Sequence, residues 1–176
     1  AYKFDGIDDW IRVPYDTGKL GINGASGISF GAWVYPADND ISNERIISQG
    51  ADYRMYGIST NLIRCHGKSA GNVDESVQSI SFKNWNHIVC TYDGINNVTK
   101  IYVNGIETVS GGTSVGTMVD NSNNLIIGAT TNGAANHFNG TIDKVFVINR
   151  TISPEEIKLL FNNQSHVLSS KETNRG

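Results

Sequence analysis

Apolar and polar residues alternate along most of the chain, and this period of two predicts strands with one buried face. Asn-Gly and Asp-Gly pairs, such as Asn104-Gly105 and Asn139-Gly140, supply the positive-φ positions that hairpin turns require. The segments with this pattern are residues 2–4, 10–14, 28–35, 45–49, 53–59, 62–66, 77–82, 86–92, 99–103, 107–110, 124–129 and 140–149. Many short strands at regular spacing predict an all-β sandwich or barrel.

One segment near the C-terminus predicts a helix instead. Residues 153–156 read Ser-Pro-Glu-Glu, a capping box with proline at the first helical position. Ile157, Leu160 and Phe161 then share one helical face, and the Asn-Asn pair at 162–163 predicts its end. We expect this short helix to cover one flank of the sandwich. The polar residues 164–176 read as a tail or linker, which favours a module of a larger protein.

Composition narrows the class of protein. The chain has 176 residues, a formal net charge of -3 and only 18% charged residues, with many Asn, Ser and Thr. This composition suits an extracellular or cell-surface protein, and the length suits one domain. No apolar run approaches the ~20 residues of a membrane span, so no membrane insertion is expected. The absence of a basic stretch argues against binding to nucleic acid.

Four stretches, in order, resemble a known family. The opening "YKFDGIDDWIRVP" is similar to the first strand of laminin G-like, concanavalin A-like jelly-roll domains, and "ISFGAWVYP" to their next core strand. The stretch "WNHIVCTYDGINNVTKIYVNGIE" resembles their characteristic hairpin, and "NGTIDKVFVINRTISPEEIKLLF" their closing strand and helix. The resemblance covers roughly residues 2–162 and departs from the family at Lys144, where an acid is frequent.

This resemblance implies a two-sheet antiparallel jelly-roll sandwich over residues 1–163, with one short C-terminal helix. Its expected buried anchors are Trp33, Trp85, Ile88, Tyr92, Ile101, Val103, Val145 and Phe146. Each buried anchor contributes about 1.5–3 kcal/mol to stability. His87, two residues after Trp85, is expected to be a hydrogen-bonded framework histidine.

The resemblance also implies a structural calcium ion between the first and closing strands. Its acidic positions correspond to Asp5 and Asp143, and Asp8 and Asp9 are accessory candidates. Calcium binds six to eight oxygens, so backbone carbonyls and waters would complete the shell. Alternatively, Asp5 is a turn residue before Gly6 and Asp143 is a surface acid.

A second acidic pair follows Pro36. Asp38 and Asp40 are two residues apart, so an extended backbone places both on one side. Such an oxygen-rich loop suits calcium or sugar hydroxyls. The alternative is a solvated loop beside a proline.

Two middle strands carry candidate ligand-binding residues. Aromatic faces stack on sugar rings, and Arg or His donors bind hydroxyls or carboxylates. The candidates are Tyr53, Arg54, Tyr56, Arg64 and His66, with Asn132, Asn136, His137 and Asn139 at the rim. If these side chains point into a groove, they form a platform for a glycan. Otherwise they are ordinary exposed strand and loop residues.

The two cysteines, Cys65 and Cys90, lie in separate predicted strands. A disulfide between them requires Cα atoms within about 7 Å. The alternative is two buried free thiols that act as small apolar side chains.

Catalysis by this type of sandwich needs acid–base groups. A retaining glycosidase holds two carboxylates about 5–5.5 Å apart, and relatives that cleave β-glucans carry Glu-x-Asp-x-Glu on one strand. Here Asp74 and Glu75 are adjacent and point apart, while Glu155 and Glu156 belong to the helix cap. The chain therefore does not read as an enzyme.

The leading hypothesis is a non-catalytic module for carbohydrate binding or cell-surface adhesion, stabilised by calcium. Its partner would be a glycan or a glycosylated surface. A structural or protein-interaction domain of a larger surface protein is the main alternative. A polysaccharide-degrading enzyme, such as a lyase using Tyr56, Arg64 and His66, is a more remote one.

Overall fold

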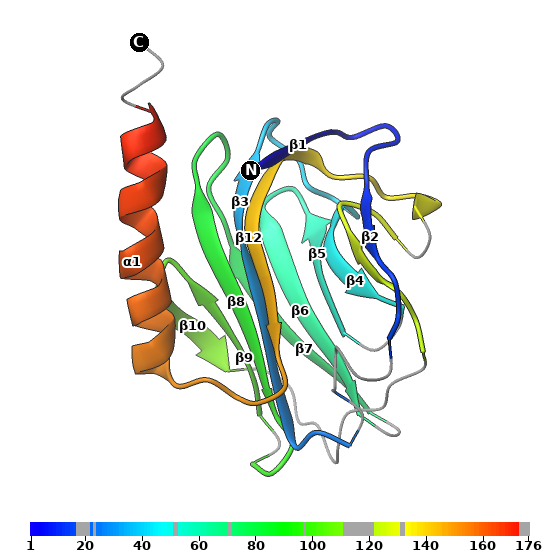
Figure 1. Cartoon of the computed structure of the whole chain (residues 1–176), viewed down its shortest axis with the longest axis vertical. Helices are drawn as coiled ribbons and strands as arrows, with labels where there is room; N and C mark the ends of the chain where they lie inside the picture. The colour runs from blue at the N-terminus through cyan, green and yellow to red at the C-terminus, as the bar shows by residue number, and fades with distance from the viewer. Residues whose placement is uncertain are drawn as a thin grey trace.

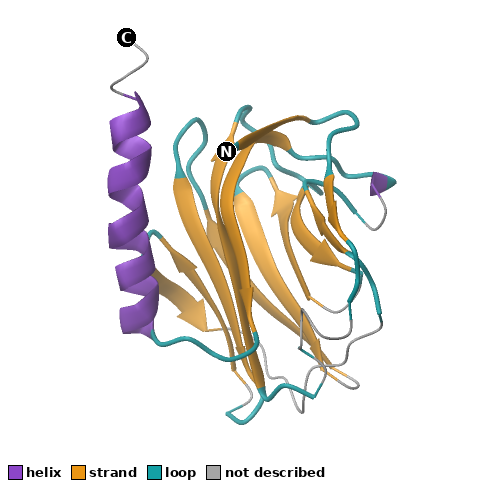
Figure 2. Cartoon of the chain, viewed as in Figure 1, coloured by secondary structure: helices purple, strands orange, loops and turns teal. Residues whose placement is uncertain are grey.

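The chain folds into two stacked antiparallel sheets with one helix beside them (Figures 1 and 2). The computed structural model describes residues 1–16, 22, 24–50, 53–69, 72–96, 98–110, 122–130 and 133–172. The first sheet contains, in spatial order, β1 (Tyr2–Asp5), β12 (Asn139–Ile148), β3 (Gly27–Pro36), β8 (Asn86–Asp93), β9 (Val98–Val103) and β10 (Ile106–Ser110). The second contains β2 (Ile11–Val13), β11 (Leu125–Ile127), β4 (Arg45–Gln49), β5 (Tyr53–Ser59), β6 (Leu62–Ser69) and β7 (Asn72–Ser79). The expected jelly-roll sandwich is confirmed.

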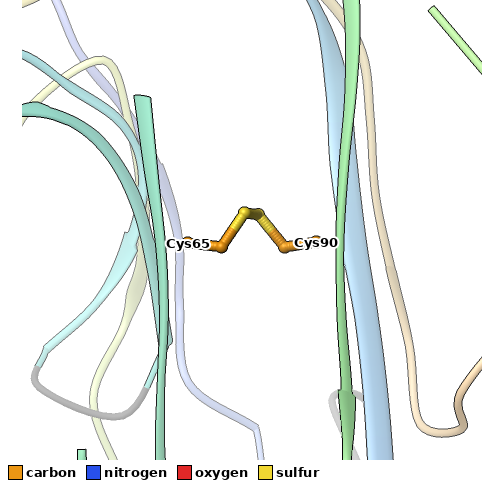
Figure 3. The surroundings of a disulfide bond; sticks show 2 residues. All are labelled: Cys65 and Cys90. Atoms are coloured by element: carbon orange, nitrogen blue, oxygen red, sulfur yellow. A yellow bond between two sulfur atoms is a disulfide. The ribbon is translucent and has the colours of Figure 1, made fainter. Parts of the chain in front are cut away.

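A disulfide joins the two sheets across the core (Figure 3). Cys65 of β6 and Cys90 of β8 are bonded, with their Cα atoms 5.7 Å apart. Both cysteines are buried among apolar side chains such as Phe30, Met55 and Ile88. Of the two alternatives that the sequence leaves open, the structure therefore selects the disulfide. Such bonds persist in oxidising compartments.

The first sheet is covered on both of its faces. Nearly every residue of β3 is buried, a pattern typical of a central strand packed on both sides. On the outer face a Cβ atom at Gly31 would lie 2.8 Å from the ring of Phe146, so only glycine fits there. Val89, Tyr102 and Ile157 form a small second apolar cluster on the same face.

The helix α1 (Pro154–Glu172) lies along the first sheet (Figure 2). Its capping box is confirmed, because the Ser153 N–H donates to Oε2 of Glu156 and the Glu156 N–H donates to Oγ of Ser153. The expected end at residues 162–163 is wrong, since the helix continues to Glu172. Asparagine only weakly disfavours a helix, and no Gly or Pro follows before the last residues of the chain. No helix in the described part of the chain has both the length and the apolar character that crossing a membrane requires.

Half of the expected anchors are fully buried, and the other half are partly buried. Trp33, Ile88, Tyr92 and Ile101 are at most 3% exposed. Trp85 is only half-buried and packs edge-on against Tyr35, with ring centroids 5.6 Å apart. The other three anchors, Val103, Val145 and Phe146, are partly buried.

Two local expectations differ from the structure. The segment expected at 77–82 is displaced, because β7 runs from Asn72 to Ser79. Its first half, Asn-Val-Asp-Glu, lacks the apolar alternation that identifies the other strands. The Asn139-Gly140 pair forms no turn; it begins β12 and pairs with Asp5 and Phe4 of β1.

Candidate functional site

The outer face of the second sheet gathers most of the residues expected on a glycan platform. Met55 and Cys65 point into the core, so their strand neighbours point away from it. In the register of the sheet, Arg54 lies opposite His66 and Tyr56 lies opposite Arg64. The alternation of β5 and β6 thus brings four of the expected residues together.

Tyr53 does not belong to this set, and its assignment to a ligand site is wrong. Its side chain is 0% exposed, and its ring centroid is 5.0 Å from that of Phe30. Adjacent residues of a strand face opposite ways. Tyr53 and Arg54 therefore could not both have faced a ligand.

Arg45 completes the face, and the sequence analysis missed it. Ile47 is buried in the core, so simple alternation would place Arg45 inside as well. A bulge between Arg45 and Ile47 interrupts the pairing of β4 with β5 and sets Arg45 opposite Tyr56. A one-residue irregularity of this kind has no signal in the apolar pattern.

Three guanidinium groups surround the ring of Tyr56. The Cζ atom of Arg45 lies over the ring, 4.0 Å from its centroid, and those of Arg54 and Arg64 lie 5.4 and 5.9 Å away. Nη1 of Arg64 donates to the Tyr56 hydroxyl at 3.5 Å, and Nη2 of Arg54 donates to Nε2 of His66 at 3.0 Å. We call Arg45, Arg54, Arg64, Tyr56 and His66 the arginine cluster. Cation–π contacts and hydrogen bonds hold it in place.

The electrostatics of the arginine cluster are clearest at Arg45 and Arg54. Burial lowers the pKa of Arg45, and the neighbouring charge of Arg54 lowers it further. Nη1 of Arg45 and Nε of Arg54 are buried without a hydrogen-bond partner. Among the described residues no carboxylate forms an ion pair with either arginine. Buried donors of this kind favour an incoming acceptor.

The loop before β12 adjoins this face through its backbone. The carbonyl of Asn136, which has a positive φ of 58°, accepts a hydrogen bond from the Arg45 N–H at 3.0 Å. Nε2 of His137 lies 3.2 Å from the carbonyl oxygen of Gly133. The expected rim residue Asn132 lies outside the described residues. The main chain of Asn136 thus lies beside this face, and its role at a ligand rim stays a prediction.

The acidic loop after β3 forms a turn stabilised by its own carboxylates. Oδ1 of Asp38 accepts the Asp40 N–H, and Oδ2 of Asp38 accepts the side-chain amide of Asn139 at 2.8 Å. Asp40 in turn accepts the backbone N–H of Ser42. Beside them, burial raises the pKa of Glu44 to about 7, and the charges of Asp38 and Asp40 add to this. Glu44 was not among the expected residues, because burial of one side chain is not readable from the sequence.

The expected metal ligands divide into two groups. Asp5 pairs with Asn139, and Asp143 lies four residues further along β12, roughly 13 Å away at ~3.3 Å per residue. A single ion cannot bind both, since calcium–oxygen distances are about 2.3–2.6 Å. Carboxylate oxygens of Asp5, Asp8 and Asp9 do come within 4.8 Å of one another, all on exposed side chains.

The donor set at Asp5, Asp8 and Asp9 fits calcium in type but supplies few ligands. Oδ1 of Asp5 already accepts the backbone N–H groups of Ile7 and Asp8, and the bond from Ile7 is the main reason that the pKa of Asp5 is lowered. Three carboxylates leave several of the six to eight positions to water or carbonyls. These residues could hold a hard cation at the turn after β1.

His87 is a packing residue. It is 0% exposed, with its ring centroid 5.1 Å from that of Trp33 and 6.0 Å from that of Phe161. Neither ring nitrogen has a hydrogen-bond partner, so the expected hydrogen-bonded framework role is wrong for the side chain. Burial lowers its pKa to about 4.

A separate hollow lies on the first sheet, beside the start of α1. Its charged side chains already have partners: Nζ of Lys100 lies 2.9 Å from Glu107, and Glu156 is paired with Arg150. The Tyr102 hydroxyl donates to Glu107. Because these groups are satisfied within the protein, the arginine cluster is the stronger candidate.

Comparison with known proteins identifies the family. A family model described as "Concanavalin A-like lectin/glucanases superfamily" (Laminin_G_3) matches residues 5–158. No curated protein sequence matches the chain.

Solved structures share the fold at low sequence identity. A Bacteroides ovatus protein described as a candidate carbohydrate binding protein superposes with a TM-score of 0.70 at 18% identity, over 89% of this chain and 45% of that one. A botulinum neurotoxin type C structure, whose description names cell entry dependent on two ganglioside molecules, has a TM-score of 0.68 at 15% identity, over 92% and 42%. The binding domain of botulinum neurotoxin DC in complex with rat synaptotagmin II gives the same TM-score, identity and coverage. The chain thus spans less than half the length of these solved chains.

Proposed function

Because the chain belongs to the concanavalin A-like lectin/glucanase superfamily, we propose that it is a non-catalytic carbohydrate-binding module. The observation that carries this proposal is the arginine cluster, in which donor side chains from three neighbouring strands converge on the outer face of the second sheet. Ligand recognition by rigid strands is favourable because their side chains are already positioned before binding. The structural similarity to the Bacteroides ovatus candidate carbohydrate binding protein is consistent with this proposal.

The chemistry of the arginine cluster favours binding over catalysis. Guanidinium, phenol and imidazole groups donate hydrogen bonds to sugar oxygens. Hydrolysis of glycosides by this type of fold uses paired carboxylates instead, and the arginine cluster contains none. Assays for new reducing ends or unsaturated uronates on a polysaccharide panel test this part. Activity in either assay would replace the proposal with an enzyme.

A glycan array tests the binding function directly. We expect the purified chain to bind a subset of glycans, and the variant Arg54→Gln to lose part of that signal. A chain that remains folded but binds no glycan on the array would refute the proposal. Protein recognition is the second candidate, because a relative of the same fold is described in complex with synaptotagmin II.

Cellular setting and calcium belong to the same proposal. The Cys65–Cys90 disulfide supports an extracellular or cell-surface location, and the greater length of the related chains supports a module of a larger protein. A calcium ion at Asp5, Asp8 and Asp9 would stabilise the fold by binding only the native state. Millimolar calcium is then expected to raise the melting temperature of metal-stripped protein but not of an Asp8→Asn/Asp9→Asn variant. An unchanged melting temperature for the unmodified chain removes calcium from the proposal.

A further inference from the structure

One face of the Tyr56 ring is covered and is not available as a stacking platform for a sugar. The guanidinium of Arg45 lies over the ring at 4.0 Å from the centroid, which is contact distance. Neutral sugars bind proteins largely through aromatic faces and shared hydroxyl hydrogen bonds. With this face of Tyr56 covered, recognition at the arginine cluster depends on the guanidinium groups themselves.

The positions of those groups favour a negatively charged ligand. The Cζ atoms of Arg45 and Arg54 lie 4.0 and 5.4 Å from the same ring centroid, so both positive charges adjoin Tyr56. Each of the two residues has a buried nitrogen without an acceptor, Nη1 of Arg45 and Nε of Arg54. An anion placed between them would reduce the repulsion and accept from the unpaired donors at the same time. Burial lowers the pKa of Arg45, and the charge of Arg54 lowers it further.

We propose that the arginine cluster is an anion-binding subsite that recognises the carboxylate or sulfate group of an acidic glycan. This inference rests on the proposed carbohydrate-binding function and names its ligand class. Guanidinium forks match the planar geometry of carboxylates and the oxygen edges of sulfates through paired hydrogen bonds. Contact with Tyr56 fixes the plane of the Arg45 guanidinium, and the His66 ring holds one end of Arg54. The fork is therefore oriented before the ligand arrives.

Matched acidic and neutral oligosaccharides test the inference by isothermal titration calorimetry. The carboxylate arm compares tetragalacturonic acid with its methyl ester, and the sulfate arm compares dextran sulfate with dextran of equal length. We expect the acidic member of at least one pair to bind at least about tenfold more tightly than its neutral partner, and added salt to weaken that binding. Binding in one arm alone identifies the charged group.

Variants separate the subsite from general charge attraction. Arg45→Gln and Arg54→Gln are expected to weaken acidic binding at least about tenfold. Lys3→Gln removes the same charge from the exposed strand β1 of the other sheet and is expected to change affinity less than twofold. Circular dichroism and thermal melting establish that each variant is folded. Arg54→Lys keeps the charge without the fork and is expected to fall between the unmodified chain and Arg54→Gln.

The possible results distinguish the anion-binding subsite from the carbohydrate-binding function on which it rests. Equal binding of acidic and neutral sugars, unaffected by the arginine variants, overturns the anion subsite and leaves carbohydrate binding intact. Acidic binding that Lys3→Gln weakens as much as Arg54→Gln also overturns it. No binding to these probes or to a glycan array overturns both proposals.

Discussion

The buried imidazole of His87 makes the stability of this protein depend on pH in a calculable way. In the folded chain the pKa of His87 is about 4, because its ring is enclosed between Trp33 and Phe161 without a hydrogen-bond partner. The unfolded chain binds a proton near the ordinary pKa of 6.5. Stability is therefore complete above pH 6.5 and is lost as the pH falls toward 4. The difference of about 2.5 pKa units corresponds to about 3 kcal/mol at most.

Urea unfolding at several pH values between 7.5 and 4.5 measures this loss for the unmodified chain and for His87→Phe. All other side chains are the same in both proteins, so the difference between the two curves isolates His87. We expect this difference to change by up to ~1.4 kcal/mol per pH unit near pH 5, in favour of the variant as the pH falls. His137→Gln, in the half-buried loop before β12, removes a histidine outside this group of rings and is the matched control. Parallel curves for the unmodified chain and His87→Phe would refute the argument that His87 is folded in its neutral form.

Three further changes have defined outcomes. Replacing both Cys65 and Cys90 by Ala opens a 25-residue loop in the unfolded chain. This is expected to lower the free energy of unfolding by ~3.5 kcal/mol and the melting temperature by about 7–14 °C. A decrease in melting temperature of less than about 2 °C would contradict this expectation. Glu44→Gln removes a carboxylate whose pKa is about 7 and which must ionise in the folded state above that pH. Compared with the unmodified chain, the variant is expected to be more stable by up to about 3 kcal/mol at pH 8 and equally stable below pH 4.5. Urea titrations at both pH values measure this difference. Arg54→Met removes a half-buried charge that has no carboxylate partner among the described residues. The variant is expected to be as stable as the unmodified chain or more stable by about 1 kcal/mol. A clear loss of stability in chemical denaturation would show that Arg54 stabilises the fold.

The alternation of apolar residues predicted an all-β sandwich or barrel, and the family resemblance selected the jelly-roll sandwich. Strand β5 matches its expected range because mainly one of its faces is buried, and burial imposes the period of two. The part of β7 before Val77 was missed because this strand is at the edge of its sheet, where neighbours impose less on the sequence. The start of the helix was predicted correctly because a capping box is a local signal. Its end was predicted wrongly, because the helix continues where no Gly or Pro stops it.

The candidate site was harder to predict because it depends on register between strands. Within each strand, the period of two already places Arg54 beside Tyr56 and Arg64 beside His66 on one face. The distance between Asp5 and Asp143, by contrast, follows from how β1 pairs with β12, which no single strand reveals. The same holds for the disulfide, because only the stacking of the two sheets brings the cysteine strands face to face.

The arginine cluster also differs from the rest of the sandwich in how its residues are arranged. Most of the described core follows local rules, with apolar side chains inside, and the buried ring of His87 is an exception. Here three like charges converge on one ring, and a bulge in β4 is what brings the third of them there. Neither repulsion nor an irregular strand stabilises a fold, and conflicts of this type are expected where binding has shaped the surface. The bulge and the charges together are thus more easily explained by a ligand than by stability.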